Sequence, residues 1–176
     1  MAIRAESDQH IEVHKYYGGM LAIGGVAFLA LTLQSFLPKY LPQATLLELP
    51  LLTTLYFGLA RRNPATGLLL GMAIGLAQDA VSGPRVPLGY FGIAKTLVGF
   101  VASSIGARLD TEHPLARALL VFGAFHLQQA ALVVMSRWLM AQHEPFFSTR
   151  TLMASLVNVG LSLFLFPLLD RLRKPS

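Results

Sequence analysis

The segment from Pro64 to Val81 reads PATGLLLGMAIGLAQDAV, and it decides which class of fold this chain can adopt. Its only charged residue is Asp79, and glycines recur every four residues at Gly67, Gly71 and Gly75. In an α-helix, residues four apart lie along one face, so these glycines predict a smooth groove that leads to a carboxylate. A segment of this length can cross the hydrocarbon core of a bilayer, which is about 30 Å thick. The segment therefore predicts a transmembrane helix with a close-packing face.

The rest of the chain has the composition of a membrane protein. Hydrophobic residues make up 54% of the 176 residues and charged residues 13%, and the mean hydropathy is +0.56. An average globular chain carries roughly 25% charged residues, so this chain has too few polar side chains to cover a soluble domain. Apolar stretches predict six transmembrane helices, at Tyr16–Leu37, Ala44–Ala60, Pro64–Val81, Leu88–Ala107, Pro114–Ser136 and Ser148–Leu169. We expect an all-α, six-helix bundle in the lipid bilayer over residues 16–169, between an N-terminal arm at 1–15 and a basic tail at 170–176.

The second of these stretches is the weakest candidate for a span. Its length is near the lower limit for crossing a bilayer, and Pro50 lies inside it. Proline removes a backbone hydrogen bond from a helix, so a kink is expected near Pro50. A re-entrant segment is the alternative for this stretch.

Basic residues are distributed unequally between the two faces of the predicted bundle. Nine lie on the face that holds both termini and four on the opposite face. Cytoplasmic loops of membrane proteins carry an excess of Lys and Arg, so we expect both termini to be cytoplasmic. This topology accounts for the net charge of +5 without a nucleic-acid partner.

Charged residues gather in the half of the bundle that is remote from the termini, where Glu48, Asp79, Arg85 and Lys95 predict a polar cluster. Charges inside a membrane are costly unless they are paired or hydrated, so such residues are functional candidates. Asp79 and Lys95 fall at similar depth on consecutive antiparallel helices, and we expect them to pair. The alternatives are that Glu48 is the partner of Lys95, that Lys95 extends outward along its aliphatic stem, and that Asp79 is hydrated at its helix end.

Four polar residues lie nearer the middle of the fifth and sixth predicted spans: His126, Gln128, Gln129 and Asn158. We expect them to form hydrogen bonds between helices, which are common and modest in membrane proteins.

Signatures of catalysis and of metal binding are absent from the sequence. The chain has no cysteine and no hydrolase elbow, phosphate loop or paired carboxylates. Near the N-terminus, His10 and His14 flank Glu12, but in the zinc-protease motif the glutamate directly follows the first histidine. We therefore expect no enzyme activity, no catalytic residues, no metal and no cofactor.

One part of the chain, from Tyr56 to Gly99, has a family pattern. It holds the run YFGLARRNP at 56–64, the glycine helix ending in Gly75-Leu76 with Asp79 three residues on, the Ser82-Gly83 turn, and Pro87-Leu88-Gly89. This pattern resembles the rod shape-determining membrane protein MreD family. In motif the resemblance covers about a quarter of the chain, and in length and number of spans it covers all of it.

The resemblance implies a non-enzymatic subunit of the cell-elongation machinery for peptidoglycan, in the bacterial inner membrane. Members associate with the single-span periplasmic scaffold MreC and, through it, with RodA, penicillin-binding protein 2 and MreB. From their spacing, we expect Gly67, Gly71, Gly75 and Asp79 to form the surface that receives the partner's helix; the alternative is that this face packs against another helix of the bundle. The family's fold is also similar to the six-helix substrate-binding subunit of energy-coupling-factor transporters. The alternative function is therefore a small-molecule, vitamin-binding subunit of such a transporter.

Overall fold

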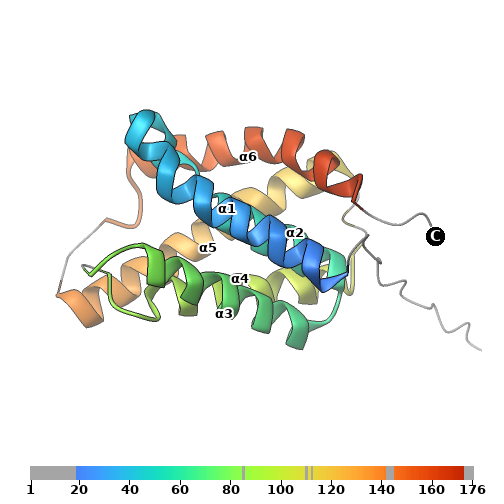
Figure 1. Ribbon diagram of the computed structural model, residues 1–176, viewed down its shortest axis with the longest axis horizontal. Coiled ribbons are helices and arrows are strands. Elements are labelled where there is room, and N and C mark those ends of the chain that lie inside the picture. The colour runs from blue at the N-terminus through green and yellow to red at the C-terminus, as the bar shows by residue number, and fades with distance from the viewer. Residues whose placement is uncertain (1–18, 85, 110, 112, 142–144, 173–176) are drawn as a thin grey trace, which may run out of the picture.

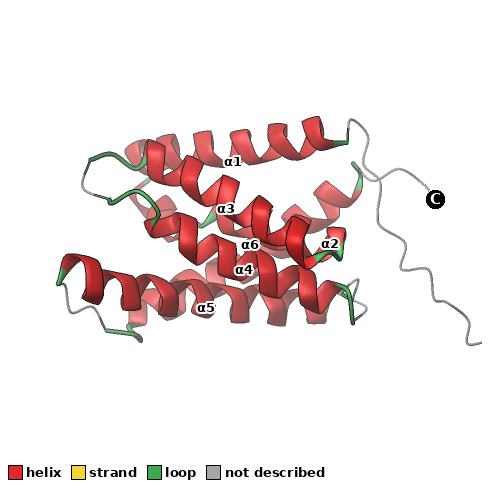
Figure 2. Ribbon diagram, turned by 90° about the horizontal axis from the view of Figure 1, so that it is seen from below, coloured by secondary structure: helices red, strands yellow, loops and turns green. Residues whose placement is uncertain are grey.

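The computed structural model describes residues 19–84, 86–109, 111, 113–141 and 145–172, which form helices joined by short loops (Figures 1 and 2). The expected N-terminal arm, with His10 and His14, lies outside the described residues, as does the end of the tail at 173–176. In chain order the helices are α1 (Met20–Tyr40), the 3-10 helix η1 (Pro42–Leu46), α2 (Leu49–Arg61), α3 (Pro64–Val81), α4 (Tyr90–Gly106), α5 (Pro114–Met140) and α6 (Thr149–Asp170).

Local sequence explains where several helices begin. The side chain of Asn63 accepts hydrogen bonds from the backbone N–H groups of Ala65 and Thr66, and Pro64 occupies the first turn of α3, where its missing N–H costs nothing. Ser148 caps α6 in the same way by accepting from the N–H of Thr151. The α2–α3 turn is tight because Arg62 adopts a left-handed conformation, with φ of 53°.

The second predicted span differs from the structure. The stretch that was expected to be one helix kinked at Pro50 is divided into η1 and α2, and Pro50 lies in the first turn of α2, where it does not break a hydrogen bond. Helix α2 has only 13 residues, so it is about 20 Å long, which is shorter than the hydrocarbon core. Every residue from Pro50 to Ala60 is buried. The expectation of a kink is therefore wrong, and α2 is a central helix surrounded by protein.

The helices form one bundle around α2, which contacts each of the other α-helices (Figure 1). Successive helices alternate in direction, so the start of α1 and the end of α6 lie at the same end of the bundle, on the right of Figure 1. At that end Arg61 contacts Met20 and Arg117 pairs with Asp170. The opposite end holds η1, the α3–α4 turn and the start of α6.

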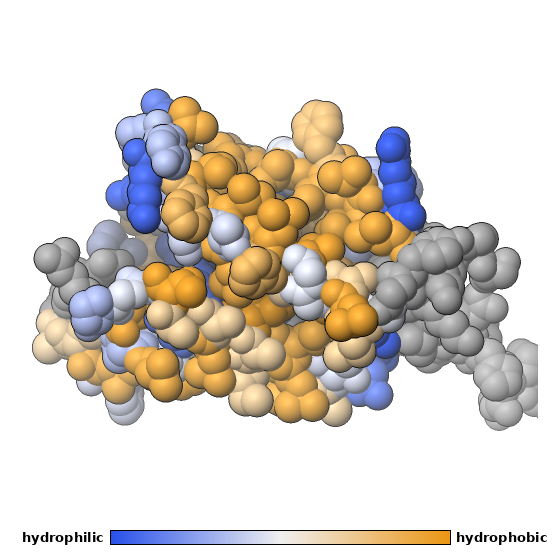
Figure 3. All heavy atoms as spheres, viewed as in Figure 1, coloured by the Kyte–Doolittle hydropathy of each residue, from blue (hydrophilic) through white to orange (hydrophobic). Residues whose placement is uncertain are grey.

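The outer surface is that of a multi-pass membrane protein. Four helices, α1, α3, α5 and α6, are long and apolar enough to cross a membrane, and α4 is a shorter apolar helix of 17 residues. Large apolar side chains such as Phe28, Leu119 and Phe164 are more than half exposed. Figure 3 shows a broad apolar surface over the middle of the bundle, with hydrophilic residues gathered toward its two ends. An exposed surface of this kind is stable when lipid covers it.

Candidate functional site

The glycine face of α3 is occupied by α4. A Cβ atom placed on Gly71 would lie 2.7 Å from the carbonyl carbon of Lys95 and still closer to its oxygen. A Cβ on Gly75 would lie 2.5 Å from the carbonyl oxygen of Phe91, and one on Gly67 would collide with the backbone of Gly99. These distances are shorter than real Cβ contacts, so only glycine allows the two backbones to approach this closely.

This packing corrects the expectation that Gly67, Gly71, Gly75 and Asp79 receive a partner's helix, and agrees with the alternative of packing within the bundle. The chain's own α4 fills the groove, and the three glycines are buried along it. A partner helix would have to displace α4. The glycine face is therefore part of the packing between α3 and α4.

Asp79 caps the N-terminus of α4. Its carboxylate accepts hydrogen bonds from the backbone N–H groups of Gly89 at 2.8 Å, Phe91 at 2.8 Å and Gly92 at 3.0 Å. The first N–H groups of a helix have no partner within the helix and carry a partial positive charge, which a carboxylate neutralises. Asp79 is 4% exposed, so it is not hydrated at a helix end. Its role is to lock the turn between α3 and α4.

Lys95 is completely buried and pairs with Glu48. Its ammonium Nζ lies 3.7 Å from Oε2 of Glu48 and donates a hydrogen bond of 2.9 Å to Oε1 of Gln128. The ring of Phe91 faces the same ammonium, with its centroid 5.0 Å away. No salt bridge joins Lys95 to Asp79, whose oxygens are engaged in capping α4. The structure therefore pairs Lys95 with Glu48, the alternative partner expected from the sequence, and not with Asp79.

The expected polar cluster is only partly assembled. Glu48, which directly precedes α2, meets Lys95 of α4, while Asp79 belongs to a separate capping site in the α3–α4 turn. Arg85 lies outside the described residues. The cluster also includes Gln128, one of the polar residues expected to form hydrogen bonds between helices.

Two amides hold η1 and the start of α2 in place. Asn158 on α6 accepts from the N–H of Glu48 at 2.9 Å and donates to the carbonyl oxygen of Leu46 at 2.8 Å. Gln34 on α1 donates to the carbonyl oxygen of Leu47 and accepts from the N–H of Leu49. The interhelical hydrogen bonds expected of Asn158 are thus confirmed, whereas Gln34 was missed. The signal for Gln34 was its position as a polar residue within an apolar helix.

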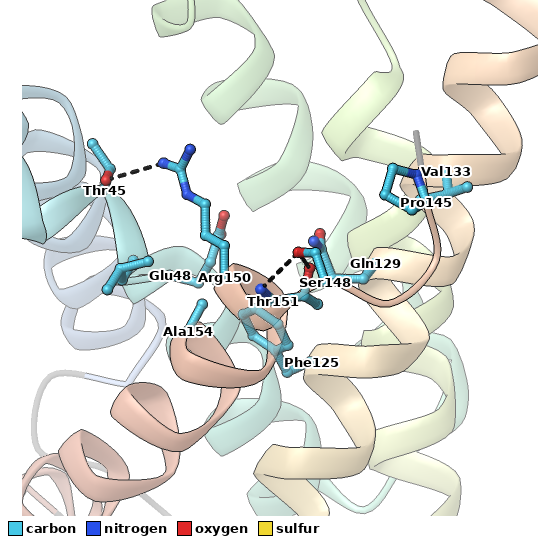
Figure 4. A pocket seen from close by; sticks show the side chains of 11 residues that line it. Thr45, Glu48, Phe125, Gln129, Val133, Pro145, Ser148, Arg150, Thr151 and Ala154 are labelled. Carbon is cyan, nitrogen blue, oxygen red and sulfur yellow. Dashed lines mark hydrogen bonds between the residues drawn. The ribbon is translucent and has the colours of Figure 1, made fainter. Parts of the chain in front are cut away.

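A polar cavity of about 270 Å³ lies next to Glu48, between η1, α5 and the start of α6 (Figure 4). On one side of it are Thr45 and Glu48, and on another are Gln129 and Phe125 of α5. Arg150 extends from α6 to η1, where it donates a hydrogen bond of 3.2 Å to Oγ1 of Thr45. The remaining lining residues are Leu46, Val133, Pro145, Ser148, Thr151 and Ala154. Nothing in the sequence around Arg150 marks it as part of a cavity.

An apolar groove of about 590 Å³ runs along the outer side of the α3–α4 pair. Leucine and methionine residues at four-residue spacing line it from α3, and the α4 side combines small residues with larger apolar ones. The hydroxyl of Thr96 donates to the carbonyl oxygen of Gly92 within the helix, so it presents no free donor to the groove. The lining residues are Leu68, Met72, Leu76, Gly89, Gly92, Ile93, Thr96, Leu97 and Phe100.

A second charged network ties the helices together at the end of the bundle that holds Met20 and Asp170. Asp170 accepts hydrogen bonds from the hydroxyl of Tyr56 at 2.9 Å and from the guanidinium of Arg117 at 2.6 Å. Arg117 also donates to the carbonyl oxygen of Thr111. These contacts join α2, α5 and α6, and the hydroxyl of Tyr56 thereby ties α2 to α6.

Comparison of the chain with models of known protein families, with curated proteins and with solved structures finds no match in any of the three.

Proposed function

We propose that this chain is a non-enzymatic, multi-pass subunit of the rod-shape peptidoglycan synthesis complex in the bacterial inner membrane. In this proposal it binds an MreC-like single-span scaffold and, through that scaffold, acts with RodA, penicillin-binding protein 2 and MreB. The family pattern from Tyr56 to Gly99 supports the assignment, and it coincides with the end of α2, α3, the following turn and most of α4. The pattern residues form the closely packed α3–α4 hairpin, and a partner binds the outer face of that hairpin in this proposal.

The observation that carries the proposal is the apolar groove on the outer side of α3 and α4. Leu68, Met72 and Leu76 form the wall on α3. On α4, the small side chains at Gly92 and Thr96 leave room for another helix to approach. In lipid, helices associate through close packing rather than through a hydrophobic driving force, and small residues allow that approach. From Gly89 to Phe100 the groove spans about 16 Å by the helical rise, or roughly half the hydrocarbon core. About three turns of a single partner helix fit such a surface.

The proposed topology has six helices crossing between the two faces, with both termini in the cytoplasm. Alternating helix directions support it, because the start of α1 and the end of α6 lie at one end of the bundle. Nine basic residues fall on that side in the sequence, in keeping with the positive-inside rule. The short helix α2 crosses within the bundle rather than against lipid.

A photo-cross-linking amino acid at Leu97, in the groove, tests the partner surface. Leu163 on α6 provides the matched control, since the two leucines are 40% and 47% exposed on different faces. In native membranes we expect position 97, and not position 163, to cross-link a single-span protein with a large periplasmic domain. Equal cross-linking from both positions, or products with lipid alone, would count against the groove as the partner surface.

The cellular role needs a separate readout. Replacement of the chromosomal gene by Leu97→Trp should give rounded cells, because the indole fills the groove, whereas Leu163→Trp should leave rods. Recovery of the ATPase subunits of a vitamin importer with the tagged wild-type chain would instead support the transporter alternative.

A further inference from the structure

The polar cavity between η1, α5 and α6 combines features that packing alone does not require. It lies toward the end of the bundle where α5 ends and α6 begins. Its walls carry a carboxylate from Glu48, a guanidinium from Arg150, and hydroxyl and amide groups from Thr45 and Gln129. Ligand sites are typically cavities in which a few convergent polar groups fix the orientation of the molecule.

The guanidinium of Arg150 has capacity for an anion. Its one hydrogen bond goes to the hydroxyl of Thr45, and among the described residues no carboxylate lies within salt-bridge distance of it. Guanidinium groups bind phosphate and carboxylate oxygens through two parallel N–H donors. The neighbouring charges of Glu48 and Lys95 cancel, so among the described lining residues Arg150 contributes one excess positive charge. An anionic group is the complement of this charge.

The carboxylate of Glu48 has capacity for a hydrogen-bond donor. It receives no hydrogen bond from the described residues, and its Oε2 is buried without a hydrogen-bond partner at 3.7 Å from the Lys95 ammonium. An acceptor in this state is costly unless a donor reaches it. A primary ammonium or a hydroxyl group on a bound molecule would supply that donor.

We propose that the polar cavity binds a phosphate group paired with a primary ammonium, as in phosphoethanolamine. The phosphate contacts Arg150 and Thr45, and the ammonium contacts Glu48. At about 30 Å³ for each water-sized group, a cavity of about 270 Å³ holds roughly nine non-hydrogen atoms, which matches such a group. The chemistry has two sources, the head group of phosphatidylethanolamine and soluble phosphoethanolamine. This inference goes beyond the proposed function and does not depend on it.

Binding is measured on the purified full chain in phosphatidylcholine nanodiscs. One arm adds phosphatidylethanolamine and counts retained lipids by native mass spectrometry. The other arm titrates soluble phosphoethanolamine, with phosphocholine as the comparison, because a quaternary ammonium has no N–H to donate. We expect the ethanolamine form to bind at least about tenfold more tightly than the choline form, as for one hydrogen bond to a charged group. Binding in the lipid arm alone identifies the lipid as the source, and binding in both arms identifies the free head group.

Variants connect binding to the cavity. Arg150→Gln should weaken binding about tenfold or more, whereas Lys39→Gln should leave it unchanged, because Lys39 is an exposed cation at the same end of the bundle that does not line the cavity. The double change Glu48→Leu with Lys95→Met removes the acceptor for the ammonium without leaving a buried charge unpaired. It should abolish the preference for ethanolamine over choline.

Three results would overturn the proposal. The first is that neither ethanolamine compound binds more tightly than its choline counterpart. The second is that Lys39→Gln weakens binding as much as Arg150→Gln. The third is that the folded double variant keeps the wild-type preference.

Discussion

Gly71→Ala should loosen the packing of α3 against α4. The added Cβ would lie 2.7 Å from the carbonyl carbon of Lys95, whereas ordinary contact begins near 3.4 Å, so α3 and α4 must separate by at least about 0.7 Å. Both atoms of the clashing carbonyl belong to the backbone, and no side-chain rotation relieves the overlap. Overpacking of this kind costs about 1–3 kcal/mol.

The matched control is Gly123→Ala on α5, where an added Cβ meets nothing within 4 Å. Both substitutions share the helix-propensity gain of about 1 kcal/mol, so their difference isolates the cost of overpacking. A difference of about 2 kcal/mol corresponds to a Tm about 4–8 °C lower for Gly71→Ala in a protein of this size.

Thermal unfolding of the two purified variants, followed by size-exclusion chromatography in the same detergent, measures this difference. Gly67→Ala should resemble Gly71→Ala, because its Cβ would meet the backbone of Gly99 and the side chain of Ser103. If Gly71→Ala melts at the same temperature as Gly123→Ala, the close approach of α3 and α4 is not what stabilises the hairpin, and the reasoning fails.

Three further predictions concern the polar groups inside the bundle. Glu48→Gln should destabilise the fold by about 3–5 kcal/mol, because it leaves the buried Lys95 ammonium unpaired. Adding Lys95→Met should recover most of this loss. If the two changes lower Tm additively, Glu48 and Lys95 do not stabilise each other. Asp79→Ala should lower the free energy of unfolding by about 2 kcal/mol, and it should speed hydrogen exchange at the N–H of Phe91 more than at residues of α6. Unchanged exchange at Phe91 would contradict the capping role. Asn158→Leu removes the hydrogen bonds to Leu46 and Glu48, so proteolysis between η1 and α2 should be faster than in the wild type when both are compared at the same temperature interval below their Tm. Unchanged cleavage would show that other contacts hold this segment.

The apolar helices and several of their boundaries follow directly from the sequence. Pro64 after Asn63, Pro114 after His113, and Ser148 before α6 start helices in the predicted places, because capping and proline geometry are local effects. Pro50 was misjudged for a related reason. A proline is harmless in a first turn and disruptive in an interior, and only the position of the helix start distinguishes the two.

The sequence by itself determined that this chain forms apolar helices with a glycine face on one of them and a few costly charges inside, because composition and helical periodicity are properties of the chain alone. Only the tertiary structure decided what meets those groups. It placed α4 against the glycines, gave Asp79 to the N-terminus of α4, and paired Lys95 with Glu48 instead. It also brought Arg150 and Thr45 together across 105 positions of sequence. Contacts between helices depend on how whole faces pack, and residue spacing along one helix does not specify its neighbour.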